Sequence, residues 1–184
     1  MGLTLKRSFS VLIAALAFGL CLTACGDEGP SLSEMREFRA YPVYYSGTSV
    51  DGNSLREVQG DPTRYEDKRD TSWFLIYGRC KDPPAEGGCF PPLQIHSYSI
   101  CTRWPDRESR LFDFRGAKAT KPMRGSGAAV EIFTGRTTVT IGAENQAVFN
   151  SAVRALREVN QKRPSPLLPP PVPGSLTGDL PCQG

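Results

Sequence analysis

Histidine is almost missing from this chain of 184 residues, which has only His96 and no Cys-x-x-Cys pair. Protein zinc sites draw on closely spaced cysteine and histidine ligands, so the sequence predicts no metal site. The chain also lacks a Gly-x-Ser-x-Gly elbow, and Gly125-Ser126-Gly127 is not followed by the Gly-Lys-Ser/Thr of a phosphate-binding loop. We therefore name no catalytic residue and no cofactor, and the protein is more simply explained as a noncatalytic one.

A strong excess of one charge is missing as well. The chain has 22 basic and 19 acidic residues. Two of the basic residues, Lys6 and Arg7, lie within residues 1–24, which we expect to be removed, and their loss leaves a net charge of +1. A nearly neutral protein offers no general electrostatic attraction for nucleic acid.

One run of apolar and small residues stands out, Phe9 to Ala24, and it begins shortly after Lys6 and Arg7. A membrane-spanning helix needs about 20 apolar residues, so this shorter run is typical of a signal peptide over residues 1–24. Its last residues and the next one, Leu22-Thr23-Ala24-Cys25, resemble the lipobox of bacterial lipoproteins. The alternative is an ordinary secretory signal with a chance cysteine.

The lipobox resemblance implies that Cys25 is the lipidation site, carrying diacylglycerol and fatty acyl groups such as palmitate. Two or more acyl chains give firm anchoring. We expect a lipoprotein held on the extracytoplasmic face of the cell membrane, in the cell envelope. Residues 25–37 would form a lipidated tether.

Four cysteines remain after Cys21 and Cys25 are set aside. An even number of cysteines in an oxidising compartment indicates disulfides, and four cysteines allow three connectivities. We favour Cys80–Cys89, which closes a loop rich in proline and glycine, and Cys101–Cys182, which pins the tail. A metal or redox role for these thiols is the weaker alternative.

The stretch from Trp73 to Cys101 is the most apolar part of the chain beyond the leader. Trp73 to Tyr77 carries apolar residues on both faces of an extended segment, which predicts a buried strand. Leu93 to Ile100 resumes the extended pattern. The core is expected to form against these segments.

Val130 to Ile141 has the pattern of a β-hairpin around Gly135-Arg136. Glycine at the first position of a two-residue loop is typical of a type II′ turn. The predicted register pairs Val130 with Ile141 and Thr134 with Thr137. Glu131, Phe133, Thr138 and Thr140 then share the face opposite to the apolar one.

Residues Glu144 to Gln161 show helical periodicity with one apolar arc, and Pro164 ends the pattern. The sequence therefore predicts a single α+β domain over residues 38–163. We expect a mostly antiparallel sheet with one long C-terminal amphipathic helix packed on it, stabilised by disulfides. Residues 164–184 form a proline-rich tail, which we expect to be docked rather than free for a proline-binding partner.

Three tyrosines, Tyr41, Tyr44 and Tyr45, lie in a short extended pattern and could form a ligand-stacking surface. The simpler interpretation places them in the core. His96 lies in an alternating segment beside Gln94 and Tyr98, where a buried, hydrogen-bonded histidine is the simpler expectation. If a site exists, we would look where Glu86, His96 and the tyrosines converge.

The run Glu86 to Ile95 resembles a segment of uncharacterised lipoproteins of high-GC Gram-positive bacteria, a resemblance that implies location but no activity. The leading hypothesis is a membrane-anchored binding or interaction module whose partner is an envelope protein or a small ligand. The alternatives are a small extracytoplasmic hydrolase and a structural component of the envelope.

Overall fold

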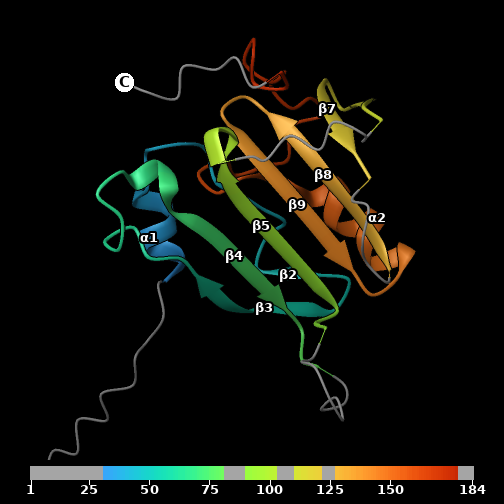
Figure 1. Cartoon of the computed structure of the whole chain (residues 1–184). Coiled ribbons are helices and arrows are strands. Elements are labelled where there is room, and N and C mark those ends of the chain that lie inside the picture. Colours follow the sequence, from blue (N-terminus) through green and yellow to red (C-terminus); the bar gives the residue numbers. More distant parts are fainter. Residues whose placement is uncertain (1–30, 81–89, 103–109, 122–126, 178–184) are drawn as a thin grey trace, which may run out of the picture.

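Eight strands form one antiparallel sheet in the order β2-β3-β4-β5-β9-β8-β7-β6 (Figure 1). The computed structural model describes residues 31–80, 90–102, 110–121 and 127–177. A separate pair, β1 with β10, is also antiparallel. The prediction of a mostly antiparallel sheet is confirmed.

The helices and strands are numbered in chain order. The strands of the large sheet are β2 (Ser49–Val50), β3 (Asn53–Gln59), β4 (Ser72–Tyr77), β5 (Leu93–Ser99), β6 (Phe112–Phe114), β7 (Ala117–Thr120), β8 (Ala128–Thr134) and β9 (Thr137–Ala143). The remaining elements are α1 (Leu32–Glu37), β1 (Tyr44–Tyr45), η1 (Lys68–Asp70), η2 (Ile100–Thr102), α2 (Gln146–Ala155) and β10 (Arg157–Glu158).

Two strand meanders build the large sheet. Strands β2 to β5 follow one another in space as in the sequence, and so do β6 to β9. The two groups meet where β5 pairs with β9, from Leu93 opposite Ala143 to Ser99 opposite Thr137. The last strand of each meander therefore lies in the middle of the sheet.

The β8–β9 hairpin has the register that the sequence predicts. Val130 pairs with Ile141 and Thr134 with Thr137. Gly135 has a φ of +52°, a left-handed conformation that glycine adopts without a steric penalty. Because side chains alternate along a strand, this register places Glu131 and Phe133 on the face opposite to Ile132.

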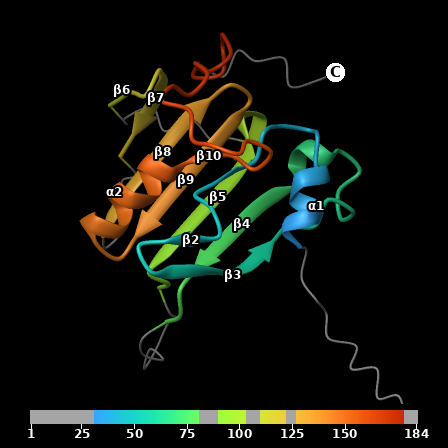
Figure 2. The same ribbon diagram turned by 180° about the vertical axis from the view of Figure 1, so that it is seen from behind.

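One face of the sheet is the core face. It carries Trp73, Leu75 and Tyr77 from β4, which are all fully buried. Helices α1 and α2 and the β1–β10 pair lie over this face (Figure 2), and Met35 of α1 and Ala152 of α2 belong to the same core cluster. We call the opposite face the outer face. It carries Phe74 and Ile76, which are only half-buried. The sequence predicts a strand buried on both faces, whereas β4 is fully buried only on its core face.

The long C-terminal helix predicted over Glu144 to Gln161 is wrong. Helix α2 covers only Gln146–Ala155, after Asn145 caps it by accepting from the backbone N–H of Ala147 and Val148. The chain then leaves the helix because Arg157 and Glu158 pair with Tyr45 and Tyr44 as β10. The apolar arc was read correctly as a buried face, since Leu156 and Val159 are buried, but tertiary pairing overrides the helical pattern beyond Ala155.

The predicted disulfides are not seen as complete pairs within the described ranges. No disulfide joins two cysteines of the described ranges. Cys80 and Cys101 are each disulfide-bonded, but Cys89 and Cys182 lie outside the described residues. The pairing therefore stays a prediction.

Residues 164–177 lie along the domain, in agreement with a docked tail. The backbone N–H of Gly135 donates to Pro170 O at 3.1 Å, and the N–H of Val172 donates to Gly135 O at 3.1 Å. Leu168, which is buried, donates its N–H to Arg115 O at 2.6 Å. We call residues 164–177 the strap.

The guanidinium of Arg115, at the β6–β7 turn, fastens the strap to the end of α2. It donates to Val153 O at 2.6 Å, to Leu156 O and Pro166 O at 3.4 Å each, and to Ser165 O. Burial lowers the pKa of this group. One side chain thus bridges a helix end and the strap.

The predicted signal peptide and the lipidation site Cys25 lie outside the described residues. The end of the predicted tether is structured, because residues Leu32–Glu37 form α1 with a capping box between Ser31 and Glu34. Within the described ranges, no helix is long and apolar enough to cross a membrane.

Candidate functional site

The outer face of β4, β5 and β8 holds a group of aromatic and polar side chains. The register places Phe74 of β4 opposite His96 of β5, His96 opposite Thr140 of β9, and Thr140 opposite Glu131 of β8. Tyr98 lies two residues beyond His96 and therefore on the same face. In Figure 1, no helix lies over these strands on the side that faces the reader.

Three of these side chains contact one another as a series of rings. The ring centroids of Phe74 and His96 are 5.5 Å apart with an interplanar angle of 72°, and those of His96 and Tyr98 are 4.9 Å apart. Such distances are favourable for aromatic pairs. We call Phe74, His96, Tyr98 and Glu131 the outer band.

The carboxylate of Glu131 is held by its neighbour. The hydroxyl of Tyr98 donates to Glu131 Oε1 at 2.6 Å, a short bond of the charge-assisted type. Both residues are half-buried. The bond fixes a carboxylate beside the aromatic series and leaves its second oxygen able to accept from a ligand.

His96 is half-buried, and none of the described residues forms a hydrogen bond with its imidazole. Its ring packs against those of Phe74 and Tyr98. Burial lowers the pKa of His96, because desolvation disfavours the charged imidazolium. The sequence-based expectation of a hydrogen-bonded core histidine is therefore wrong.

A pocket of about 350 Å³ adjoins the outer band at the β3–β4 end. We call it the edge pocket, and its lining residues are Gln59, Gly60, Asp61, Arg64, Tyr65, Ser72 and Phe74. Phe74 belongs to both the pocket and the outer band. Small-molecule pockets usually have volumes of about 300–1,000 Å³, so this hollow is large enough for a small ligand.

The wall of the edge pocket is ordered by local contacts. Asp61 Oδ1 accepts from the backbone N–H and the hydroxyl of Thr63 at 2.9 and 2.6 Å, and from the N–H of Arg64 at 3.1 Å. The hydroxyl bond from Thr63 is the main reason why the pKa of Asp61 is lowered. The Arg64 guanidinium lies 5.7 Å from the centroid of the Tyr65 ring, and Tyr65 remains 40 % exposed.

Gly60 shapes the pocket floor by a close approach of the backbone. A Cβ atom at this position would lie 2.6 Å from a ring carbon of Trp73. Only glycine allows the chain to pass so close to the buried indole. The pocket thus depends on the packing of β4 on its core side.

The arrangement does not resemble a general base with an orienting group. A catalytic histidine usually donates its second ring nitrogen to a carboxylate or a carbonyl. Among the described residues His96 has no such partner, and Glu131 accepts from Tyr98. Within the same residues, no three His, Cys, Asp or Glu side chains are grouped so that they could hold a metal ion.

The three tyrosines that the sequence singles out lie in the core. Tyr41, Tyr44 and Tyr45 are 3 %, 1 % and 6 % exposed, so they present no exposed stacking surface. They pack on the core face, where the N–H of Tyr44 donates to Ser97 Oγ at 3.1 Å and Tyr41 OH donates to Thr71 O and to Ser97 O. His96 lies on the opposite face of the same strand.

The predicted convergence of the tyrosines with His96 therefore does not occur, and Glu86 lies outside the described residues. Of the predicted ligand-binding residues, only His96 is part of the outer band. The hydroxyl of Tyr45 accepts from the Arg157 guanidinium at 3.3 Å, and this guanidinium lies 4.7 Å from the Tyr45 ring centroid. These contacts give Tyr45 a structural role at the β1–β10 pair.

Sequence reasoning missed Phe74, Tyr98 and Glu131 as a group. The alternation of Gln94, His96 and Tyr98 was visible, and so was the hairpin face that carries Glu131. What joins them is the pairing of β5 with β9, and no local sequence signal specifies that long-range pairing.

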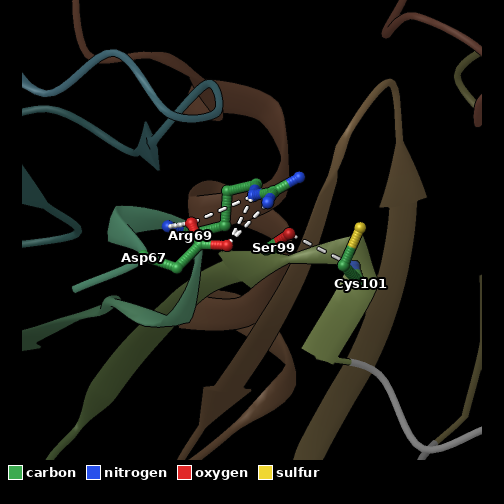
Figure 3. Close-up of polar contacts among 4 residues, drawn as sticks. All are labelled: Asp67, Arg69, Ser99 and Cys101. Carbon is green, nitrogen blue, oxygen red and sulfur yellow. Dashed lines mark hydrogen bonds and ion pairs between the residues drawn. The ribbon is translucent and has the colours of Figure 1, made fainter. Parts of the chain in front are cut away.

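A second group of polar contacts lies where η1 and the start of η2 meet (Figure 3). Asp67 Oδ1 accepts from the N–H of Arg69 at 2.9 Å, and the two side chains form an ion pair of 2.7 Å. Nearby, the N–H of Cys101 donates to Ser99 Oγ at 3.2 Å. These contacts are local caps of short helical turns, and no described pocket is lined by them.

Two other hollows are lined by described residues, and both are larger. One, of about 570 Å³, lies at α1 and is lined by Glu34, Glu37, Phe38, Arg39, Ala40, Pro62 and Lys68. The other, of about 440 Å³, is lined by Arg110, Leu111, Phe112, Thr120 and Lys121. We place the candidate site at the outer band and the edge pocket, because the series Phe74, His96 and Tyr98 joins this pocket to the Glu131 carboxylate.

Comparison of the chain with protein families, with curated proteins and with solved structures finds no match.

Proposed function

We propose that this protein is a membrane-anchored extracytoplasmic lipoprotein that binds a small ligand at the outer band and the edge pocket, without catalysing a reaction. The observation that carries the proposal is the series Phe74, His96 and Tyr98, which runs from a pocket toward a fixed carboxylate. Pockets that combine aromatic walls with a few polar groups are typical of ligand sites.

Among the residues that the structure describes, the contacts of His96 and Glu131 favour binding over hydrolysis. A general base must reach the proton that it removes and is oriented by a neighbour. His96 meets rings on two sides, and the carboxylate of its face accepts from a tyrosine. These contacts suit recognition of a ligand surface better than proton transfer.

The anchoring part of the proposal is based on the sequence Leu22-Thr23-Ala24-Cys25. The capping residue of α1 is Ser31, so few residues separate Cys25 from the folded part. At about 3.5 Å per extended residue, this linker holds the domain within roughly 20 Å of the membrane surface. A ligand would therefore be bound close to the membrane.

Two measurements test the proposal. Cells that express the chain are fed an alkyne analogue of palmitate, and the label should appear on the wild type and disappear in Cys25→Ser. Independently, the full chain in detergent micelles is screened by NMR against a chemically diverse fragment library. We expect the amide shifts that respond to hits to lie around Phe74, His96 and Tyr65, and hits confined to other surfaces would contradict the proposed site.

A further inference from the structure

We infer that the ligand of the outer band and the edge pocket is a carbohydrate, a saccharide of at least two neutral rings. The inference rests on the proposed function and names the chemical class of its ligand. The aromatic rings, the hydrogen-bonding groups and the charges of the site all favour this class.

Aromatic rings follow one another from the pocket outward. Tyr65, 40 % exposed, and Phe74 both line the edge pocket. His96 continues from Phe74 at 5.5 Å and Tyr98 from His96 at 4.9 Å. Aromatic rings pack well against the C–H faces of sugar rings, because they offer large apolar area with a polar edge. One sugar ring would lie in the pocket and the next along the outer band.

Groups that can bind sugar hydroxyls lie beside these rings. Ser72 and Gln59 line the pocket, and Thr140 lies between His96 and Glu131 in the same cross-strand row. Hydroxyl and amide groups both donate and accept. The second oxygen of Glu131 adds a strong acceptor.

The charges argue against the other common classes of ligand. Recognition of phosphates and nucleic acids relies on several cations, whereas the described residues of the site include one guanidinium, that of Arg64, which lies against the Tyr65 ring. The carboxylates of Asp61, Glu131 and Glu57 accept from Thr63, Tyr98 and Gln59 respectively. A site with rings, hydroxyls and amides and little free charge fits a neutral polyhydroxylated ligand.

The test uses the full chain in detergent micelles and isothermal titration calorimetry. The probes are four neutral tetrasaccharides, namely the β-1,4-linked glucose and N-acetylglucosamine oligomers, the α-1,4-linked glucose oligomer and an α-linked mannose oligomer. Phosphocholine and inorganic tripolyphosphate are the charged probes. We expect binding of at least one tetrasaccharide and of neither charged probe.

Variants locate the binding. Removal of one stacking ring in Tyr65→Ala or Phe74→Ala should weaken the saccharide about tenfold. Tyr98→Phe keeps the ring but frees Glu131, and it should weaken binding by a smaller factor. Phe112→Ala is the matched control, because Phe112 is also an exposed ring, 39 % exposed, but lies at the far edge of the sheet. Tyr65→Ala keeps the test valid if Phe74→Ala fails to fold.

Each other outcome overturns the inference. If phosphocholine binds and is lost in the same variants while no saccharide binds, the ligand class is wrong but the proposed site is right. If a saccharide binds equally well to Tyr65→Ala and Phe112→Ala, the site is wrong. If neither the saccharides nor the fragments of the NMR screen shift signals of the outer band, both the inference and the proposed function fail.

Discussion

Two adjacent threonines of β9, Thr137 and Thr138, give a direct test of how buried hydroxyls affect the stability of this domain. Both residues are fully buried, and they point to opposite faces of the strand. The hydroxyl of Thr137 donates to Pro42 O at 2.7 Å. Among the described residues, Thr138 Oγ1 has no hydrogen-bond partner.

Replacement by valine keeps the β-branched shape and removes only the hydroxyl. An intramolecular hydrogen bond contributes about 1 kcal/mol net, and a buried polar group left without a partner costs about 1–3 kcal/mol. Thr137→Val should therefore lower the free energy of unfolding by about 1–2 kcal/mol. Thr138→Val should raise it by about 1 kcal/mol, because the uncompensated desolvation of the hydroxyl disappears.

The assay is urea unfolding followed by circular dichroism at constant pH and salt. The slope of the free energy against urea should stay the same in all three proteins, so that a shift in midpoint reports a change in stability. For a domain of this size, 1 kcal/mol corresponds to a change in melting temperature of about 2–4 °C. The reasoning is refuted if Thr138→Val is destabilised as much as Thr137→Val, because Thr138 would then have a bonding partner in solution.

Three further predictions follow from single features of the structure. Arg115→Lys should lower the free energy of unfolding by about 2 kcal/mol, because an ammonium cannot donate to all the carbonyls that the half-buried guanidinium reaches. The midpoint of urea unfolding measures this change, and Arg115→Ala should lower the free energy of unfolding by at least as much. The lowered pKa of His96 means that the folded state binds the imidazole proton more weakly than the unfolded state does. The contribution of neutral His96 to stability is therefore complete above the ordinary pKa of 6.5 and is lost as the pH falls below that value. His96→Gln should flatten the slope of unfolding free energy against pH in that range, and an unchanged slope would contradict this. Burial raises the pKa of Tyr44 to about 12 and that of Tyr41 and Tyr77 still further, so absorbance at alkaline pH should show these three phenols still protonated at pH 11 in the folded protein and ionised at the same pH in urea.

The sequence predicted those parts of the fold that depend on local pattern. The β8–β9 hairpin was predicted to the residue, because Gly135 fixes the turn and the alternation from Val130 to Ile141 fixes the register. Strands β4 and β5 were predicted from the extended apolar patterns of Trp73 to Tyr77 and Leu93 to Ile100. The helix after Glu144 was predicted too long, because the periodicity of buried residues continues through Leu156 and Val159 although the backbone changes from helix to β10.

The candidate site could be predicted only in part. His96 was identified as an isolated imidazole, but its neighbours come from strands far away in the sequence. The aromatic tyrosines before β2 attracted attention because they are close together in sequence. In the fold they fill the core, where the hydroxyl of Tyr44 lies 3.4 Å from Thr134 Oγ1. The outer band instead combines side chains of β4, β5 and β8.

The meeting of the two meanders at β5 and β9 has a consequence for the order of folding. Within each meander, the longest connection between neighbouring strands is residues 78–92, whereas β5 and β9 pair across roughly 40 to 50 residues and must overcome a larger loss of chain entropy. The outer band lies across this junction, since His96 belongs to β5 and Glu131 to β8. Two half-sheets would therefore form first, and the ligand site would be assembled only when they dock.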